Sequence, residues 1–323
     1  MNRSIPSPGP IVPVQAPDIS AYAAGNTGVD YVHTFDSGRS GPHAMICALM
    51  HGNELCGAIA LDYLLRKAVR PDTGRLSYAF FNVDAFETFD SENPAESRYV
   101  DEDMNRLWHR RFLECDRESN ELRRARTLLP VIDSVDLLLD LHSMQHERTP
   151  LSLAGPTDKG RLLAMQLGRP GVVVADKGHA GGVRLRDYGA FADPASPRNA
   201  VLVECGQHMD GESVSVALEA SLRFLLATGV ASRATVEAHL VAPDKRLPPP
   251  RVVVVTHAVM AETESFEFEK DFSGLEEIRQ AGTLIGWDGE REIRTPYDAC
   301  VLVMPTRRTA PGHTAVRFGR YVD

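Results

Sequence analysis

The chain has 323 residues, of which 43% are hydrophobic and 24% are charged, and its formal net charge at pH 7 is −9. This length and composition are those of an ordinary globular protein with a sizeable core. The acidic balance argues against nucleic acid or an anionic membrane as a partner, because both attract basic surfaces.

The cysteines and the N-terminus indicate the compartment. The five cysteines are odd in number and scattered along the chain, mostly inside apolar runs, so they do not form a disulfide framework. The N-terminus lacks the apolar core of a signal peptide, and no apolar run approaches the length of a membrane span. We therefore expect a cytoplasmic protein with no membrane partner.

Composition divides the chain into three parts. Residues 1–30 are rich in Pro, Ala, Ser and Gly and are predicted to form an arm on the surface or on a partner subunit, which makes the chain a candidate homo-oligomer. Residues 31–240 carry alternating strand and helix patterns. A proline-rich break at 241–250 then leads into short strands and turns, so residues 241–323 are predicted to form a smaller C-terminal all-β domain that acts as a lid or subunit contact.

The first elements of the long middle part form a strand-helix-strand unit. Residues 31–35 and 43–50 are predicted strands, residues 55–69 a helix, and residues 76–83 the next strand. The second of these strands is almost continuously apolar, which is typical of a parallel strand that is covered on both faces. A parallel, right-handed crossover is the default for such a unit. The sequence thus predicts an α/β fold with a mixed, largely parallel sheet flanked by helices.

Two irregular segments interrupt the later elements. Residues 84–111 and 176–199 are predicted loops, and a long loop inside a compact domain is usually functional. The elements around them are a charged helix over residues 117–129, strands over 134–140, 150–155, 171–175 and 200–203, and helices over 159–167 and 213–228. The predicted C-terminal strands cover residues 251–255, 282–287, 292–295, 299–304 and 314–318.

Four ionisable residues follow apolar strands at their carboxyl ends: His51 and Glu54 in one turn, then His142, then Glu204. Ligands of open α/β sheets bind at this edge. Two imidazoles and one carboxylate are a known ligand set for a catalytic zinc with one open position. We predict that His51, Glu54 and His142 bind zinc, and that Glu204 removes a proton from the water in the open position.

Each of these residues also has a plainer interpretation. His51 and Glu54 could form a surface pair, His142 could be a hydrogen-bonded core histidine, and Glu204 could be a strand-end ion-pair partner. Their common placement favours a shared ion, because a buried polar group without a partner costs about 1–3 kcal/mol. Asp140, two residues before His142, either orients that imidazole or caps a turn.

Together with Arg98 and the run Asp103-Met-Asn-Arg106, these residues resemble the succinylglutamate desuccinylase and aspartoacylase family, a branch of the zinc carboxypeptidase-like hydrolases. The resemblance covers about residues 31–230. It implies a zinc carboxypeptidase-like fold with one zinc ion per chain, held by His51, Glu54 and His142, and Glu204 as the general base. It also implies that Arg98, Asn105 and Arg106 grip a substrate carboxylate and polarise the scissile carbonyl, with Arg98 also acting in catalysis.

The chemistry of these side chains agrees with that implication. A guanidinium forks onto a carboxylate bidentately, so an arginine-rich loop beside zinc selects an acidic or amino-acid-like substrate. Without the motif, ion pairs with Asp101, Glu102 and Asp103 would explain the same arginines, and Asp103 is still predicted to brace the loop.

The implied activity is hydrolysis of the amide bond of a small N-acyl amino acid or related carboxylate. A zinc carboxypeptidase acting on short peptides and a catalytically silent, ligand-binding relative are the alternatives. The chain departs from the family pattern at two substrate residues. Arg184, Arg186 and Arg198 are equal candidates for the further arginine that precedes the glutamate, and Tyr297 is the nearest counterpart of a C-terminal tyrosine.

Overall fold

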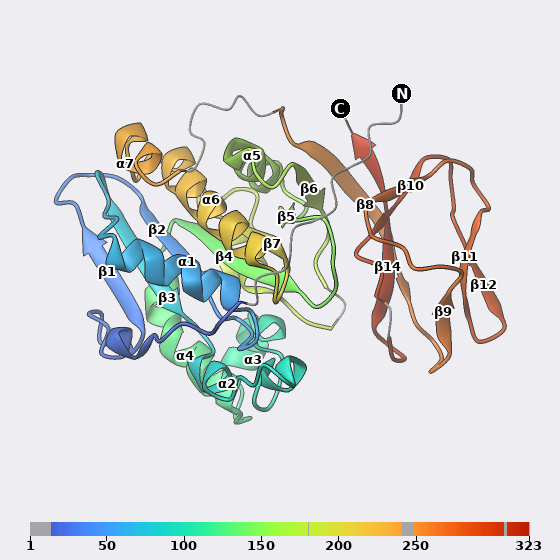
Figure 1. Cartoon of the computed structure of the whole chain (residues 1–323), viewed down its shortest axis with the longest axis horizontal. Helices are drawn as coiled ribbons and strands as arrows, with labels where there is room; N and C mark the ends of the chain where they lie inside the picture. Colours follow the sequence, from blue (N-terminus) through green and yellow to red (C-terminus); the bar gives the residue numbers. More distant parts are fainter. Residues whose placement is uncertain (1–13, 180, 241–247, 307–308, 323) are drawn as a thin grey trace.

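One extended sheet runs through the computed structural model, which describes residues 14–179, 181–240, 248–306 and 309–322. Within these ranges eleven strands form the sheet, and three more form a small second sheet (Figure 1). In spatial order the large sheet contains β1 (Val32–Asp36), β3 (Arg75–Phe80), β2 (His43–Ala48), β4 (Leu137–Met144), β7 (Asn199–Gln207), β5 (Leu151–Leu153), β6 (Val172–Ala175), β8 (Arg251–Met260), β14 (Thr314–Val322), β13 (Cys300–Val303) and β10 (Glu276–Ile278). The small sheet contains β12 (Arg291–Arg294), β11 (Leu284–Asp288) and β9 (Phe266–Phe268).

Strand directions divide the large sheet into two regions. β3, β2, β4 and β7 are mutually parallel, whereas β8, β14, β13 and β10 are antiparallel. The first region has the strand-helix-strand crossover that the sequence predicts. The fold prediction, a mixed and largely parallel sheet with helices and a C-terminal antiparallel β region, is confirmed.

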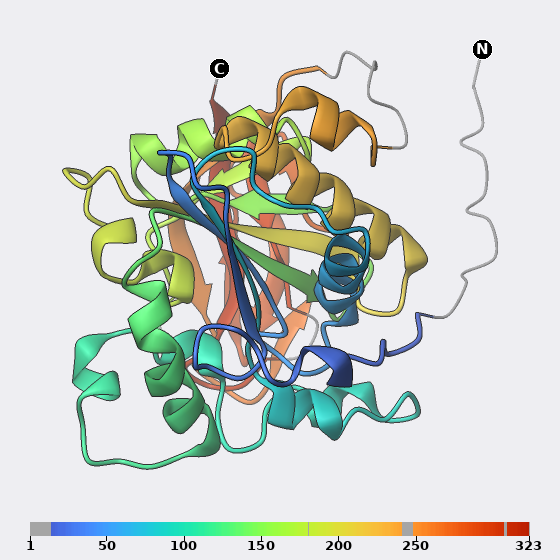
Figure 2. The ribbon, with the colours of Figure 1, turned by 90° about the vertical axis from the view of Figure 1, so that its left-hand side faces the viewer.

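Helices cover both faces of the parallel region (Figure 2). The helices are α1 (Leu55–Arg66), α2 (Val83–Glu87), α3 (Arg110–Leu113), α4 (Asn120–Ile132), α5 (Asp158–Leu167), α6 (Gly211–Ala227) and α7 (Arg233–Glu237), with 3₁₀ turns η1 (Ser20–Tyr22), η2 (Pro94–Ser97), η3 (Met104–Arg106), η4 (Leu185–Asp187) and η5 (Gly189–Phe191). α1, α5 and α6 share one apolar cluster with Ile46 of β2, and α4 shares the other with Met45. Neighbouring residues of β2 thus enter opposite clusters, which explains its continuous apolar run.

Some element boundaries differ from the predictions. The segment 84–111, predicted to be an irregular loop, contains the short helical pieces α2, η2, η3 and α3. The charged helix begins at Asn120, after the cap that Ser119 provides, and continues through Pro130 to Ile132. The strands β9 and β10 were not predicted, because three residues are too few to establish an alternating pattern.

The predicted N-terminal arm and the proline-rich break lie partly outside the described residues. Residues 1–13 of the arm and 241–247 of the break fall there. From residue 14 onward the chain packs against the α/β part: Val14 and Ile19 are buried, and the hydroxyl of Tyr22 donates a hydrogen bond to Asp62 of α1 over 2.8 Å. Boundaries at residues 30 and 240 stay predictions.

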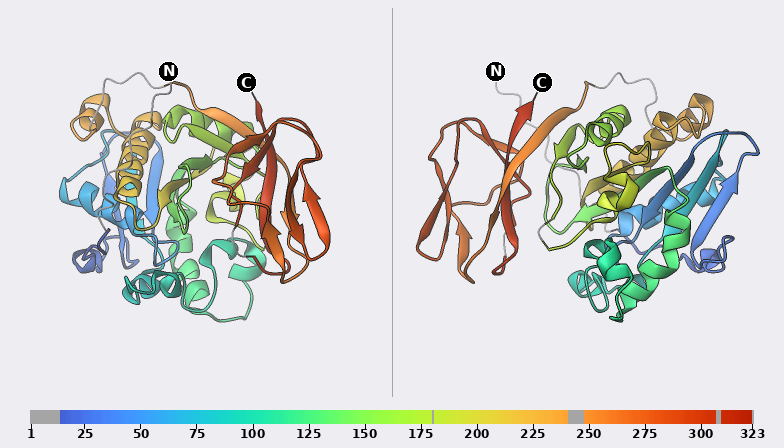
Figure 3. Two further views of the ribbon diagram at one scale, coloured as in Figure 1. Left: turned by 45° about the vertical axis from the view of Figure 1, so that its right-hand side comes forward. Right: turned by 180° about the vertical axis from the view of Figure 1, so that it is seen from behind.

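The C-terminal strands continue the main sheet. β8 pairs in parallel with β6, so β8 and β14 stand beside β5 and β6 (Figure 3). Every cysteine is a free thiol. No helix in the described ranges is both long enough and apolar enough to cross a membrane. The cytoplasmic location and the homo-oligomeric state stay predictions.

Asp288 ties the small sheet together, and Asp288→Asn is expected to lower the free energy of unfolding by about 1–3 kcal/mol at pH 7. Its carboxylate accepts hydrogen bonds from the backbone of Glu262 and Thr263 over 2.8 and 3.0 Å, and from Arg291 over 2.9 Å. Burial acts to raise its pKa, but these hydrogen bonds outweigh it and lower the pKa from 3.8 to about 2.

A carboxyl group whose pKa is lower in the folded state than in the unfolded state stabilises the fold at pH values above its unfolded pKa. This contribution is lost as the pH falls through the folded pKa. The difference between wild type and Asp288→Asn should therefore shrink between about pH 4 and 2. Thermal unfolding across this range measures it, with the exposed Glu290→Gln from the same turn as control. A difference that does not change with pH would contradict the assignment.

Candidate metal centre

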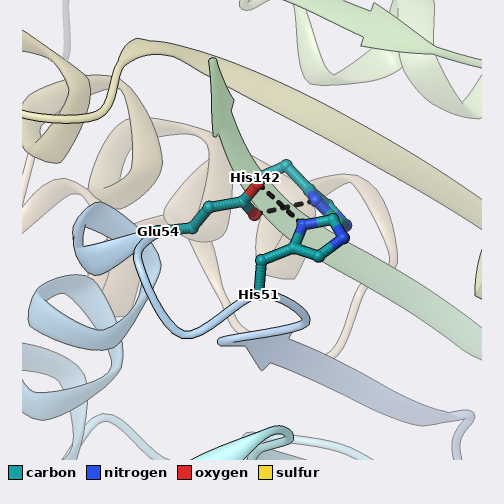
Figure 4. Close-up of side chains that lie close together, drawn as sticks. All are labelled: His51, Glu54 and His142. Carbon is teal, nitrogen blue, oxygen red and sulfur yellow. Dashed lines mark hydrogen bonds and ion pairs between the residues drawn. The ribbon is translucent and has the colours of Figure 1, made fainter. Parts of the chain in front are cut away.

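The first two candidate ligands lie on the turn between β2 and α1, where the sequence predicts them. A side chain at Gly52 would clash with backbone atoms of Ala85 and Ser97, so only glycine fits here. The Gly52 amide also donates a hydrogen bond to the carbonyl oxygen of Arg98 over 3.1 Å. These contacts pin the turn, and His51 and Glu54 point to the same side of it (Figure 4).

The Glu54 carboxylate lies between two imidazoles (Figure 4). Its Oε1 is 2.8 Å from Nδ1 of His51, and its Oε2 is 2.8 Å from Nδ1 of His142, which projects from β4. Each of these side chains is at most 4% exposed, and their ligand atoms all lie within 4.8 Å of one another. Burial acts to raise the pKa of Glu54, but the charges of the two histidines outweigh it and hold the pKa well below its usual range.

The contacts of Glu54 fit a shared cation better than a set of hydrogen bonds. Oε2 is buried and accepts no hydrogen bond from any described residue, although Nδ1 of His142 is 2.8 Å away. Its contact with His142 is an ion-pair contact, and it has no further partner among the described residues. A buried oxygen left in this state costs about 1–3 kcal/mol, which a metal ion would remove. Two imidazole nitrogens and a carboxylate suit zinc.

An aspartate lies against the outer nitrogen of each candidate ligand histidine. Nε2 of His51 is 2.9 Å from Oδ1 of Asp103, and Nε2 of His142 is 3.0 Å from Oδ2 of Asp140. Carboxylates in this position fix the ring and its tautomer in metal sites. Asp140 therefore faces the imidazole and does not cap a turn. Asp103 braces its loop as predicted, by accepting the Asn105 amide, but it also contacts His51.

Asp140→Asn is expected to weaken zinc binding by about 10–100-fold, because the amide holds the His142 ring less firmly than the carboxylate does. Competition against a chromogenic chelator measures the affinity. Asp158→Asn, at an aspartate whose side chain is 82% exposed, is the matched control and should bind zinc as wild type does. Equal affinities in both variants would show that Asp140 does not support the centre.

Glu204 lies directly across from His142 in the parallel pairing of β4 and β7. It is 9% exposed, and its Oε2 accepts no hydrogen bond from any described residue. Burial raises its pKa to about 7, although the nearby charge of His142 acts in the opposite direction. A carboxyl group that titrates near neutral pH is well suited to general-base catalysis.

The predicted arginine loop borders this centre. Arg98 donates from Nη2 to Asp103 over 3.0 Å, and its Nη1 is 3.8 Å from Glu54. Nδ2 of Asn105 is 3.5 Å from Nε2 of His142. Arg106 donates from Nη1 to its neighbour's carbonyl oxygen over 2.8 Å, and its Nη2 is 3.5 Å from Asp103. The structure thus brings together the three candidate ligands and the three loop residues.

The three further candidate arginines lie in different surroundings. Arg198 donates to the carbonyl oxygens of Val135 and Ile132, at the opposite end of the strands from the centre. Arg186 is fully buried and donates to the carbonyl oxygen of Ala200. Arg184 alone is close enough for its charge to lower the pKa of Arg106.

Tyr297 is engaged within the C-terminal region. Its hydroxyl is 2.6 Å from that of Thr256, and the guanidinium of Arg320 lies 3.7 Å from its ring centre. These contacts hold Tyr297 within the C-terminal region, and neither of them reaches the centre.

Two residues near the centre were missed in the sequence. His208, four residues after Glu204, is buried, and its Nδ1 is 2.8 Å from the hydroxyl of Ser143. Burial lowers its pKa to about 4, so the ring is neutral. Its position after a strand end was the available signal. Arg317 of β14 is the other: its Nε is 4.0 Å from Asp176, and the charge of Glu204 acts to raise its pKa. No local pattern marks Arg317, because only the pairing of distant strands brings it to Asp176.

The α/β part of the chain matches a known protein family. Residues 40–214 match the family described as "Succinylglutamate desuccinylase/Aspartoacylase catalytic domain". No curated protein is similar to the chain in sequence.

Solved structures share the fold at low identity. A succinylglutamate desuccinylase from Vibrio cholerae has 15% identity and a TM-score of 0.67, over 91% of this chain and 86% of that one. One from Vibrio parahaemolyticus has 17% identity and a TM-score of 0.65, over 91% and 87%. The product-bound ectoine utilization protein EutE (DoeB) from Ruegeria pomeroyi has 18% identity and a TM-score of 0.62, over 96% and 93%. The family match spans just over half of the chain's 323 residues. The chain therefore belongs to the succinylglutamate desuccinylase/aspartoacylase family.

Proposed function

We propose that the chain is a zinc-dependent hydrolase that removes the acyl group from a small N-acyl amino acid or a related carboxylate. The observation that carries this proposal is the Glu54 carboxylate, whose oxygens each lie 2.8 Å from Nδ1 of a different histidine, beside a buried Glu204. Membership of a deacylase family supports it, as does the likeness to proteins named as desuccinylases.

In this proposal His51, Glu54 and His142 hold one zinc ion per chain. When bound, zinc supplies a Lewis acid that polarises the carbonyl and activates water for attack. Asp103 and Asp140 keep the two imidazoles turned so that each Nδ1 faces inward.

Glu204 is the general base. Its carboxylate accepts a proton from the attacking water as the bond between oxygen and the carbonyl carbon forms. The same proton then passes to the leaving nitrogen as the bond between carbon and nitrogen breaks, which releases a carboxylic acid and an amine. Burial and the unbonded Oε2 leave this carboxylate free to accept the proton.

The arginine loop binds and polarises the substrate. Arg98, beside Glu54 and His51, donates to the carbonyl oxygen as negative charge develops there. Arg106 and the amide of Asn105 bind a substrate carboxylate. Arg98 is held by Asp103, so little rearrangement is needed when the substrate arrives.

Metal analysis and a substrate panel test the proposal. We expect about one zinc per chain, and release of amine from N-acetyl or N-succinyl amino acids that stops with a chelator and returns with zinc. Faster cleavage of dipeptides would favour the carboxypeptidase alternative. Zinc binding without any hydrolysis would favour the silent relative, and a protein that neither binds zinc nor hydrolyses would refute the proposal.

A further inference from the structure

Glu121 is a fully buried carboxylate in the first turn of α4. Its Oε1 accepts a hydrogen bond from the backbone N–H of Val100 over 2.7 Å. Its Oε2 accepts hydrogen bonds from the backbone N–H groups of Asp101 and Glu102 over 3.1 and 3.2 Å. Three consecutive amides of the arginine loop, residues 98–106, therefore donate to one side chain, and hydrogen bonds to a charged oxygen are stronger than those between neutral groups.

These three amides lie between the two loop residues that contact a candidate ligand. Arg98 precedes Val100 by two residues, and its Nη2 is 2.9 Å from Nε2 of His51. Asp103 directly follows Glu102, and its Oδ1 is 2.9 Å from the same nitrogen. A shift of the backbone between these two residues would therefore move both side chains relative to His51.

The same carboxylate also contacts the segment that leads out of β3. Its Oε1 accepts a hydrogen bond from Nδ2 of Asn82 over 3.0 Å. The backbone N–H of Asn82 donates to the carbonyl oxygen of Leu49 over 2.7 Å, and Leu49 precedes His51 by two residues. Glu121 thus joins the arginine loop to the stretch of chain that enters the ligand turn.

The acidic side chains of the loop strengthen its attachment to α4. Oδ2 of Asp101 accepts a hydrogen bond from the backbone N–H of Asn120 over 2.7 Å, and Oε2 of Glu102 accepts one from Arg117 over 2.7 Å. Asp101 and Glu102 are therefore bound at the start of α4, although the sequence also offered them as partners of the loop arginines. The backbone and the side chains of this stretch face the same helix.

We propose that Glu121 is a positioning residue for the hydrolysis, because it holds the arginine loop in place before zinc or substrate binds. Arg98 can stabilise developing charge on the carbonyl oxygen only if its guanidinium is already oriented, since such stabilisation depends on donors that need not rearrange. Glu121 acts through the backbone of residues 100–102 and not on the substrate itself. This inference rests on the proposed function, because the loop serves the same site.

Glu121→Gln tests this role in the zinc-loaded protein. Glutamine keeps the size of the side chain but replaces one acceptor oxygen by an NH₂ group, which cannot accept hydrogen bonds from the loop amides. With the best substrate of the panel, kcat should fall by about 10–100-fold, because a small displacement of an oriented group is costly in the transition state. KM should change much less, and zinc content should stay that of wild type.

Hydrogen exchange of the metal-free protein tests the contact without any chemistry. The amides of residues 100–102 should exchange about 10–100-fold faster in Glu121→Gln than in wild type, because they lose hydrogen bonds to a charged oxygen. Glu118→Gln is the matched control, since this side chain just before α4 is 62% exposed, and it should keep wild-type exchange and kcat. Glu121→Asp keeps the charge on a shorter side chain and should give intermediate values, and it replaces Glu121→Gln if that variant fails to fold.

The two measurements separate positioning from a purely stabilising role. A stabilising role would lower the melting temperature of Glu121→Gln and leave loop exchange and kcat unchanged, and that result would overturn the inference. Faster exchange with an unchanged kcat would overturn it as well, as would a lowered kcat with unchanged exchange. Failure of the proposed function looks different, because wild type would then cleave no substrate of the panel while the loop amides still exchanged faster in the variant.

Discussion

Replacing Glu204 by glutamine is expected to lower amide hydrolysis by about 10²–10⁴-fold while zinc remains bound. Glutamine has nearly the same shape as glutamate but cannot accept the proton from water. The candidate ligands lie on β4 and on the turn before α1, and none of them hydrogen-bonds to Glu204. Turnover of the best substrate in the panel and zinc content per chain are the two measurements.

Glu212→Gln is the matched control for this variant, because Glu212 is an exposed residue in the first turn of α6. It should keep wild-type turnover. If Glu204→Gln were equally active, the general-base role would have to be abandoned. If it lost zinc together with activity, Glu204 would instead belong to the ligand set.

The raised pKa of Glu204 also predicts how the protein responds to pH. The base must be deprotonated, so activity should fall as pH drops through a midpoint at or below about 7, since a bound cation lowers the value found without metal.

In the metal-free protein, the free energy of unfolding changes with pH in the opposite direction to activity. The folded state keeps the proton up to about pH 7, whereas the unfolded chain releases it near 4.5. The stability contributed by Glu204 therefore falls as pH rises through this range. Metal-free Glu204→Gln should lose less stability than metal-free wild type between pH 4.5 and 7, as measured by thermal unfolding.

His51→Ala is expected to reduce zinc content from about one ion per chain to nearly none, and to abolish turnover. Only one imidazole and one carboxylate would remain, which is fewer than the three protein ligands of a catalytic zinc site. Elemental analysis after dialysis against a weak chelator measures the metal. Added zinc should also raise the melting temperature of wild type and not that of the variant, because a ligand that binds only the folded state stabilises it.

His313→Ala provides the control, since His313 is exposed in the C-terminal region. It should bind zinc as wild type does. Full zinc content in His51→Ala would mean that the metal lies elsewhere. An unchanged melting temperature in wild type on adding zinc would mean that the folded protein does not bind it.

The parallel strands and the turn that carries His51 and Glu54 follow from sequence patterns. His142 and Glu204 were predicted to follow buried strands, but they lie inside β4 and β7, because each strand continues past its apolar run. These features are local: an apolar run ends and a polar residue follows it. Parallel strands bring their carboxyl ends to one edge, so the pattern alone groups residues that are far apart in the chain.

Which side chains meet across strands and loops depends on the three-dimensional packing. It paired Asp103 with His51, placed Arg198 against the backbone of Val135, and brought Arg317 to Asp176. Sequence patterns record whether a residue is buried and on which face it lies, but not the register and loop packing that select its partner. The pairing of β8 with β6 extends the sheet into the C-terminal region, and that long-range contact puts Arg317 of β14 4.0 Å from Asp176, which follows β6.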